Sequence, residues 1–212
     1  RVAFVRIDRE NMDIYVADLV QRSEPRRLTF DSAMDRYPIW SPDASRLLYA
    51  GVTDPKSDSK GFQLDDAVLG GSAWYSASPS GGQPVRIDPS AQFAQFLQGF
   101  PLPLAWLRSN RIVFSYNTGE TINLWMTTLT TDNRRIIGPP KQVTFGTGRV
   151  TDASVADDGT VDFATTEGRP RLWKAPFLTR QAGDKGDPMA VATNRDFTAF
   201  PTLSNTGKLA YL

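Results

Sequence analysis

The sequence predicts an all-β protein, a β-propeller of four-stranded antiparallel blades, and three observations support this fold class. One short apolar strand recurs with starts at residues 1, 46, 111, 160 and 208, so its copies are 45, 65, 49 and 48 residues apart. Two other strand patterns follow between successive copies. No segment keeps the 3.6-residue apolar period of an amphipathic helix. Four short strands about every 45 residues are typical of a propeller blade.

The clearest copy of the repeat is residues 37–51, YPIWSPDASRLLYAG. It contains two apolar strands, here called A and B, on either side of the polar turn at residues 41–45. Each later B strand also follows a turn with Asp, Asn or Gly, which tolerate the left-handed backbone of a tight hairpin. The sequence therefore predicts an A–B hairpin in each blade.

Strands C and D complete each predicted blade. Strand C has an aromatic residue at its third position, and the copies are Tyr15, Trp74, Trp125 and Trp173. Strand D is predicted at residues 26–29, 84–87, 141–144 and 190–193. The strand order is B-C-D, then A-B-C-D three times, then A-B. We therefore expect a partial propeller of three whole and two partial blades, cut from a parent with six or more. The blade units are approximately residues 1–30, 31–90, 91–148, 149–195 and 196–212.

The composition excludes several kinds of site. The 212-residue chain has neither His nor Cys, so disulfides, thiolate or His-ligated metal sites and a Ser-His-Asp triad are impossible. The net charge of +1 gives no long-range field for nucleic acid or an anionic membrane. No apolar run approaches the roughly 18 residues of a membrane span. Because nucleophile-elbow and P-loop motifs are also lacking, we predict a chain without catalytic residues, metal or cofactor.

The direction of the strands places the loops on two faces. In an antiparallel blade the B–C loops and D–A connections share one face, here called the top face. The A–B and C–D turns share the opposite, bottom face. Two long segments, residues 52–71 and 88–103, belong to the top face. The first contains several Asp residues without the spacing of a calcium loop, and we interpret it as a solvated insertion.

Two recurrent residue types are interpreted as structural. Trp40 and Trp106 occupy equivalent positions in strand A, and large aromatic residues at repeated positions indicate packing between blades rather than a stacking platform. Asp43, in the A–B turn, is explained by a side-chain-to-backbone bond within that turn.

Candidate binding residues lie on the top face. Phe93, Phe96 and Phe100 form a compact apolar cluster, which is a partner-binding patch if exposed and part of the core if buried. Charged residues precede successive A strands and should line the mouth of the central channel, where they would grip a peptide terminus or small anion, or pair with one another. These charged candidates are Asp35, Arg36, Arg149, Asp152, Arg195 and Asp196.

The A–B hairpin carries a family resemblance. Residues 37–43 followed by 46–49 resemble the WD40-like PD40 repeat of TolB-type propellers, with Ala44 in place of the usual Gly. Residues 123–125 and 138–148 look like PD40 propellers appended to bacterial serine/threonine kinases and winged-helix regulators. The resemblance implies a propeller fold and a sensor or protein-binding role. It transfers no functional residue, because the repeat motif is structural.

The leading hypothesis is a non-catalytic binding or sensor module of a larger bacterial signalling protein. Its protein, peptide or small-molecule partner would bind at the top face of the channel, and an extracytoplasmic location is slightly favoured. The alternative is the gating propeller of a prolyl-oligopeptidase-type hydrolase whose catalytic domain is not in this chain. A third hypothesis, an Asp-based glycosidase, requires Asp35 and Asp152 within about 10 Å of each other.

Overall fold

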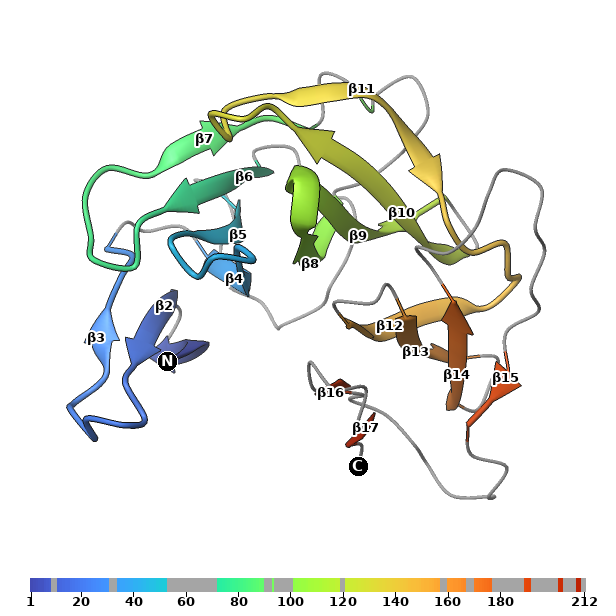
Figure 1. The fold of residues 1–212 in the computed structure, drawn as a ribbon, viewed down its shortest axis with the longest axis horizontal. Coiled ribbons are helices and arrows are strands. Elements are labelled where there is room, and N and C mark those ends of the chain that lie inside the picture. The colour runs from blue at the N-terminus through green and yellow to red at the C-terminus, as the bar shows by residue number, and fades with distance from the viewer. Residues whose placement is uncertain are drawn as a thin grey trace. The chain divides into compact units, whose positions relative to one another are not determined.

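In the computed structural model, most of the described residues are in β-strands (Figure 1). The described residues are 1–8, 11–30, 34–52, 72–89, 93, 101–118, 121–156, 160–166, 170–176, 189–191, 202–203 and 209–210. They form the predicted all-β fold of antiparallel propeller blades. Within these ranges, no helix is both long and apolar enough to cross a membrane.

The strands follow the predicted order. The first group is β1 (Val2–Asp8), β2 (Asn11–Ala17) and β3 (Arg26–Arg27), which pair antiparallel in this order. A complete antiparallel blade follows, with β4 (Met34–Trp40), β5 (Leu47–Val52), β6 (Ser72–Ala77) and β7 (Val85–Ile87). The groups correspond to B-C-D and A-B-C-D.

The later strands repeat this pattern. The next four neighbours are β8 (Leu102–Leu107), β9 (Arg111–Asn117), β10 (Ile122–Leu129) and β11 (Ile136–Gln142), with the 3-10 turn η2 (Arg108–Asn110) between β8 and β9. A further antiparallel blade consists of β12 (Arg149–Val155), β13 (Thr160–Thr166), β14 (Pro170–Pro176) and β15 (Met189–Ala190). The last hairpin pairs β16 (Thr202–Leu203) with β17 (Leu209–Ala210).

The chain divides into two compact units. Unit 1 consists of Arg1–Phe114 and Thr127–Pro140, and unit 2 consists of Ser115–Met126 and Lys141–Leu212. Strands β9, β10 and β11 each contribute residues to both units. The candidate pocket described below is made entirely of unit 1 residues.

Unit 1 has an aromatic core. Trp74 on β6 is fully buried, and its ring packs edge-on against Phe93 and Phe114, with centroids 6.4 and 5.6 Å away. Phe93 and Phe114 stack on each other at 5.3 Å. The Trp74 Nε1–H donates a hydrogen bond of 2.8 Å to the Pro101 carbonyl, so burial leaves this indole satisfied.

A pair of aromatic residues on strands B and C recurs between repeats. Phe4 on β1 faces Tyr15 on β2 with ring centroids 5.9 Å apart, and Tyr49 on β5 faces Tyr75 on β6 at 5.6 Å. Trp74 instead faces Ala50. The sequence alignment of Trp74 with Tyr15 is therefore wrong by one residue. Because neighbouring strand residues point to opposite faces, a one-residue shift moves the side chain into the core.

A threonine after strand D holds strand C in place. Thr29 accepts the Ile14 backbone N–H at 3.0 Å and donates to Asp13 Oδ1 at 3.3 Å. Thr144 makes the equivalent bond to Asn123 Oδ1 at 3.1 Å in the third repeat. These side-chain bonds continue the strand ladder beyond its last backbone pair, which explains why a threonine follows the apolar residue in both D strands.

Candidate binding pocket

The structure places the apolar candidate Phe93 in the core of unit 1. Its side chain is 1% exposed and contacts Trp74 and Phe114 through its ring. Of the two roles considered for this cluster, the contacts of Phe93 match the buried one. Phe96 and Phe100 lie outside the described residues.

The charged candidates are located on strands A. Asp35 and Arg36 lie at the start of β4, where Asp35 is 1% exposed and Arg36 is half-buried. A Cβ atom added at Gly51 would come within 2.9 Å of Asp35 Oδ1, so this carboxylate packs directly against the β5 backbone. Arg149 is exposed and Asp152 is half-buried on β12, in unit 2. Arg195 and Asp196 lie outside the described residues, and the charged channel mouth stays a prediction.

A β-bulge lies at or directly after these positions in two A strands. The pairing of β4 with β5 shifts by one residue between Arg36 and Ile39, and that of β12 with β13 shifts between Val150 and Ala153. Tyr37, within the first bulge, has a φ of 55°. A bulge redirects the side chains of its strand. The equivalent bulges indicate that the A strands of both repeats bend in the same way.

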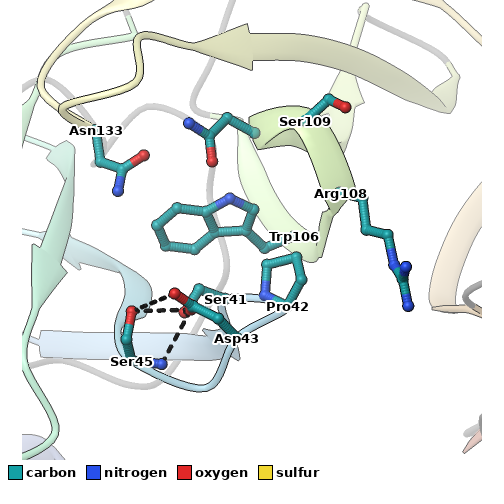
Figure 2. A pocket seen from close by; sticks show the side chains of 9 residues that line it. Ser41, Pro42, Asp43, Ser45, Trp106, Arg108, Ser109 and Asn133 are labelled. Atoms are coloured by element: carbon teal, nitrogen blue, oxygen red, sulfur yellow. Dashed lines mark hydrogen bonds between the residues drawn. The ribbon is translucent and has the colours of Figure 1, made fainter.

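A pocket of about 270 Å³ lies between turns of unit 1, at the strand ends that define the bottom face (Figure 2). Two A–B turns and one C–D turn meet there, as the strand directions require. We call it the turn pocket, and its lining residues are Ser41, Pro42, Asp43, Ser45, Trp106, Arg108, Ser109, Asn110 and Asn133.

Residues 41–46, here called the 41–46 turn, form one wall of the pocket. The Ser41 N–H donates to the Arg46 carbonyl at 2.9 Å and closes the hairpin. Asp43 Oδ1 accepts hydrogen bonds from the Ser41 hydroxyl at 2.6 Å and the Ser45 N–H at 3.1 Å. Ala44 has a φ of 54°, the left-handed conformation that the usual Gly would adopt without strain. These bonds confirm the structural interpretation of Asp43.

Residues 130–135, the 130–135 turn, repeat this arrangement between β10 and β11. The Thr130 N–H donates to the Arg135 carbonyl at 2.8 Å, and its hydroxyl donates to Asp132 Oδ1. The Arg134 N–H donates to the same oxygen at 3.1 Å, and Asn133 has a φ of 58°. Sequence reasoning missed this turn. Its signal was the Thr-x-Asp-Asn pattern, which corresponds to Ser-Pro-Asp-Ala in the 41–46 turn.

The carboxylates of the two turns are held in their ionised form. The Ser41 hydroxyl, followed by the N–H and hydroxyl of Ser45, lowers the pKa of Asp43 to about 2. The Thr130 hydroxyl and the Arg134 N–H lower the pKa of Asp132 in the same way. Hydrogen bonds to the charged form favour that form. The Oδ1 atom of each carboxylate is engaged within its own turn, so both carboxylates hold the turns that frame the pocket.

Trp106 and Asn133 each have a polar atom without a hydrogen-bond partner among the described residues. Trp106, on β8, is 6% exposed, and Figure 2 shows the Asn133 side chain pointing toward its indole ring. The Trp106 Nε1 and Asn133 Oδ1 atoms are buried, and neither has a hydrogen-bond partner among the described residues. The Asn110 side-chain amide donates to the Thr130 carbonyl at 3.2 Å and ties η2 to the 130–135 turn. The side chains that line the pocket thus include one buried donor and one buried acceptor.

Metal binding finds no support in the part of the chain that the structure describes. No group of three or more Asp or Glu side chains in it could hold a metal ion. The predicted insertion, residues 52–71, lies almost entirely outside the described residues.

Comparisons with known proteins agree on the fold. No family model matches the chain. No curated protein matches it either. A solved structure of putative TolB from Agrobacterium tumefaciens superposes with a TM-score of 0.66 at 15% identity, over 94% of this chain and 62% of that one. TolB from Acinetobacter baumannii has a TM-score of 0.60 at 18% identity, over 94% and 42% of the two chains.

A peptidase gives a third match. A puromycin-hydrolyzing peptidase of Mycobacterium tuberculosis superposes with a TM-score of 0.56 at 13% identity, over 91% of this chain and 28% of the peptidase. The chain thus spans less than two thirds of each of these structures. At such low identities the likeness concerns the fold. The chain has the fold of a TolB-type β-propeller.

Proposed function

We propose that this chain is a non-catalytic binding module, and that the turn pocket is its binding site. The observation that carries the proposal is the frame of that pocket, a volume of about 270 Å³ between turns that hydrogen bonds hold in place. A preorganised site loses little conformational entropy on binding. Such a frame favours binding at this position over the rest of the bottom face.

The chemistry of the pocket supports binding rather than catalysis. The chain has no His or Cys to act as base or nucleophile. Asp43, with a pKa of about 2, is far too weak a base for proton transfer near neutral pH. The PD40-like repeat motif supports the same role, because it resembles the propellers of bacterial sensor proteins.

A peptide-display experiment tests the proposal. A library of random dodecapeptides is panned on the full chain, with the Trp106→Phe/Asn133→Gly double variant as the subtraction control. We expect enriched peptides that bind the wild-type chain at least tenfold more tightly than the double variant. Enriched peptides that bind both proteins equally would move the site away from the turn pocket. An absence of enrichment would overturn the proposal.

The top-face residues are a separate proposal for a second surface. Arg36 would contribute positive charge to the channel mouth, and Phe96 with Phe100 would contribute an apolar patch. Peptides that bind the double variant supply the test. Their affinity should fall in Arg36→Ala or Phe100→Ala if they use the top face, and it should be unchanged if they do not.

Gating of a peptidase is the alternative function. It is favoured by the fold similarity to the mycobacterial peptidase, of which this chain covers only a part. Labelling the full-length protein with a fluorophosphonate, which reacts with active-site serines, separates the two functions. A labelled protein indicates a gating propeller beside a hydrolase domain, and an unlabelled protein supports the binding module.

A further inference from the structure

We infer that the turn pocket binds an acidic peptide, whose carboxylates pair with arginines of the surrounding turns. The inference rests on the proposed function and names the chemical class of the ligand. It is carried by the charges of the turns around the pocket, by the hydrogen bonds that join these turns into one surface, and by the exposure of the arginines.

The residues around the pocket have a surplus of positive charge. The turns that frame it, residues 41–46, 108–111 and 130–135, together with Arg1, contain no Lys, no Glu and only two Asp. They contain six arginines, here called the rim arginines, which are Arg1, Arg46, Arg108, Arg111, Arg134 and Arg135. The whole chain has a net charge of only +1, so the rest of the chain is negatively charged overall. The positive charge is therefore local to this surface.

Hydrogen bonds join these segments into one surface. The Arg1 guanidinium donates to the Ala44 carbonyl at 3.2 Å, which ties the start of the chain to the 41–46 turn. The Asn110 amide donates to the Thr130 carbonyl at 3.2 Å and ties η2 to the 130–135 turn. Side chains of all three turns line the pocket. The rim arginines therefore belong to one continuous surface around the pocket.

The rim arginines are accessible to a ligand. Four of them are exposed, namely Arg1, Arg108, Arg134 and Arg135. Arg46 and Arg111 are half-buried. Figure 2 shows the Arg108 side chain extending away from the Trp106 ring, so its guanidinium lies at the edge of the pocket rather than in its interior. A carboxylate can thus approach these groups from solvent without becoming buried.

The two turn carboxylates do not cancel this charge. Asp43 accepts hydrogen bonds from two serines of its own turn. Asp132 accepts from the Thr130 hydroxyl and from the backbone N–H of Arg134. Both carboxylates are thus held by neutral donors within their turns. Because six guanidinium groups face only two carboxylates in these segments, the surface favours an anionic ligand.

The surroundings of the arginines favour a peptide over a nucleic acid. Guanidinium groups bind carboxylates and phosphates equally well in geometry, through two parallel hydrogen bonds. A nucleic-acid strand would carry a charge at every nucleotide past Asp43 and Asp132, and its bases would need exposed aromatic rings on which to stack. Trp106, the aromatic residue of the pocket, is 6% exposed. An acidic peptide needs no such ring and can place neutral residues beside the two carboxylates.

The size of the pocket suits this ligand. A volume of about 270 Å³ holds one or two residues of a peptide. In an extended peptide each further residue lies about 3.3 Å along the chain, so the flanking residues reach the turns that carry the rim arginines. Attraction between exposed charges is screened over about 8 Å at physiological ionic strength. Binding should therefore weaken as salt is added.

A fluorescence-anisotropy titration of the full chain tests the inference. The probes are fluorescein-labelled dodecapeptides of alternating Glu-Gly or Gln-Gly, and a labelled oligothymidylate of the same length. We expect saturable binding of the Glu-Gly peptide, and binding of the Gln-Gly peptide that is about tenfold weaker or less. Raising sodium chloride from about 50 to about 500 mM should weaken the Glu-Gly complex about tenfold.

Charge-reversed variants locate the site. Arg108→Glu and Arg134→Glu should each lower the affinity for the Glu-Gly peptide about tenfold, because each replaces an attraction by a repulsion. The matched control is Arg22→Glu, which makes the same charge change at an exposed arginine of another turn that does not line the pocket. It should change the affinity less than about twofold. Since all three side chains are exposed, the midpoint of urea unfolding should stay at the wild-type value.

Each outcome has a defined meaning. Equal binding of the Glu-Gly and Gln-Gly peptides, or equal losses in Arg108→Glu and Arg22→Glu, overturns the inference. Tighter binding of the oligothymidylate than of the Glu-Gly peptide also overturns it, in favour of a nucleic acid. If peptides selected by display still bind the wild-type chain more tightly than the double variant in any of these cases, the binding-module proposal stands while the acidic ligand fails.

Discussion

The 41–46 turn and the 130–135 turn have the same backbone but different surroundings. In both, a hydroxyl residue closes the hairpin and donates to an Asp two residues later, and the next residue is left-handed. Ser41 is 7% exposed, whereas Thr130 is half-buried. The left-handed residue is Ala44 in one turn and Asn133 in the other.

The comparison shows which residues the turn itself requires and which position is left to vary. The hydroxyl and the Asp hold the hairpin and are therefore shared by both turns. The left-handed position tolerates any residue that accepts a positive φ, and Asn does so at a smaller cost than Ala. Asn133 can therefore place a polar group in the pocket while keeping the turn, which Ala44 cannot do.

The largest expected effect on stability comes from removing the buried hydroxyl of Ser41. Ser41→Ala removes the donor to Asp43 and the acceptor for the Arg46 N–H, and should lower the free energy of unfolding by about 1–3 kcal/mol. Thr130→Ala removes equivalent bonds at a more exposed site and should cost less than about 1 kcal/mol. Urea unfolding of the two variants measures both. Equal losses would show that burial does not separate the turns.

An exchange at the left-handed position should give a smaller effect. Ala44→Asn should raise the free energy of unfolding by about 0.5–1 kcal/mol, and Asn133→Ala should lower it by a similar amount, because Ala is the less tolerant of positive φ. Thermal and urea unfolding check both changes. If Ala44→Asn were destabilising, contacts of the side chain rather than backbone preference would determine which residue is most stable at position 44.

The smallest effect concerns pH. The pKa of Asp43 lies at about 2, below its ordinary value of 3.8. Its ionised form therefore stabilises the fold fully above about pH 4, and this contribution is lost as the pH falls from about 4 toward 2. Carboxyl carbon NMR should show this titration. Ser41→Ala should raise the pKa of Asp43 and leave that of Asp132 unchanged, and a shift at both would mean that the two turns are coupled.

Sequence reasoning reached the strands and the first turn but not the pocket. The A–B hairpin was predictable because its strands, its Asp and its hydroxyl are local features. Trp74 was misplaced because two aromatic residues are adjacent, and only the pairing with β5 shows which of them faces Tyr49. Asn133 was missed because its turn lacks the Pro of residues 41–45, although its hydroxyl and Asp are at the same spacing.

By itself the sequence determined the blade pattern, the turn chemistry and the exclusion of His- or Cys-based sites. The blade pattern and the turn chemistry depend on side-chain alternation and backbone preference, which are local to a few residues. The exclusion depends on composition alone. Only the tertiary structure decided that Phe93 is buried and that Trp106 and Asn133 line one pocket with the 41–46 turn. Those outcomes depend on packing between segments far apart in the chain, which no local pattern records.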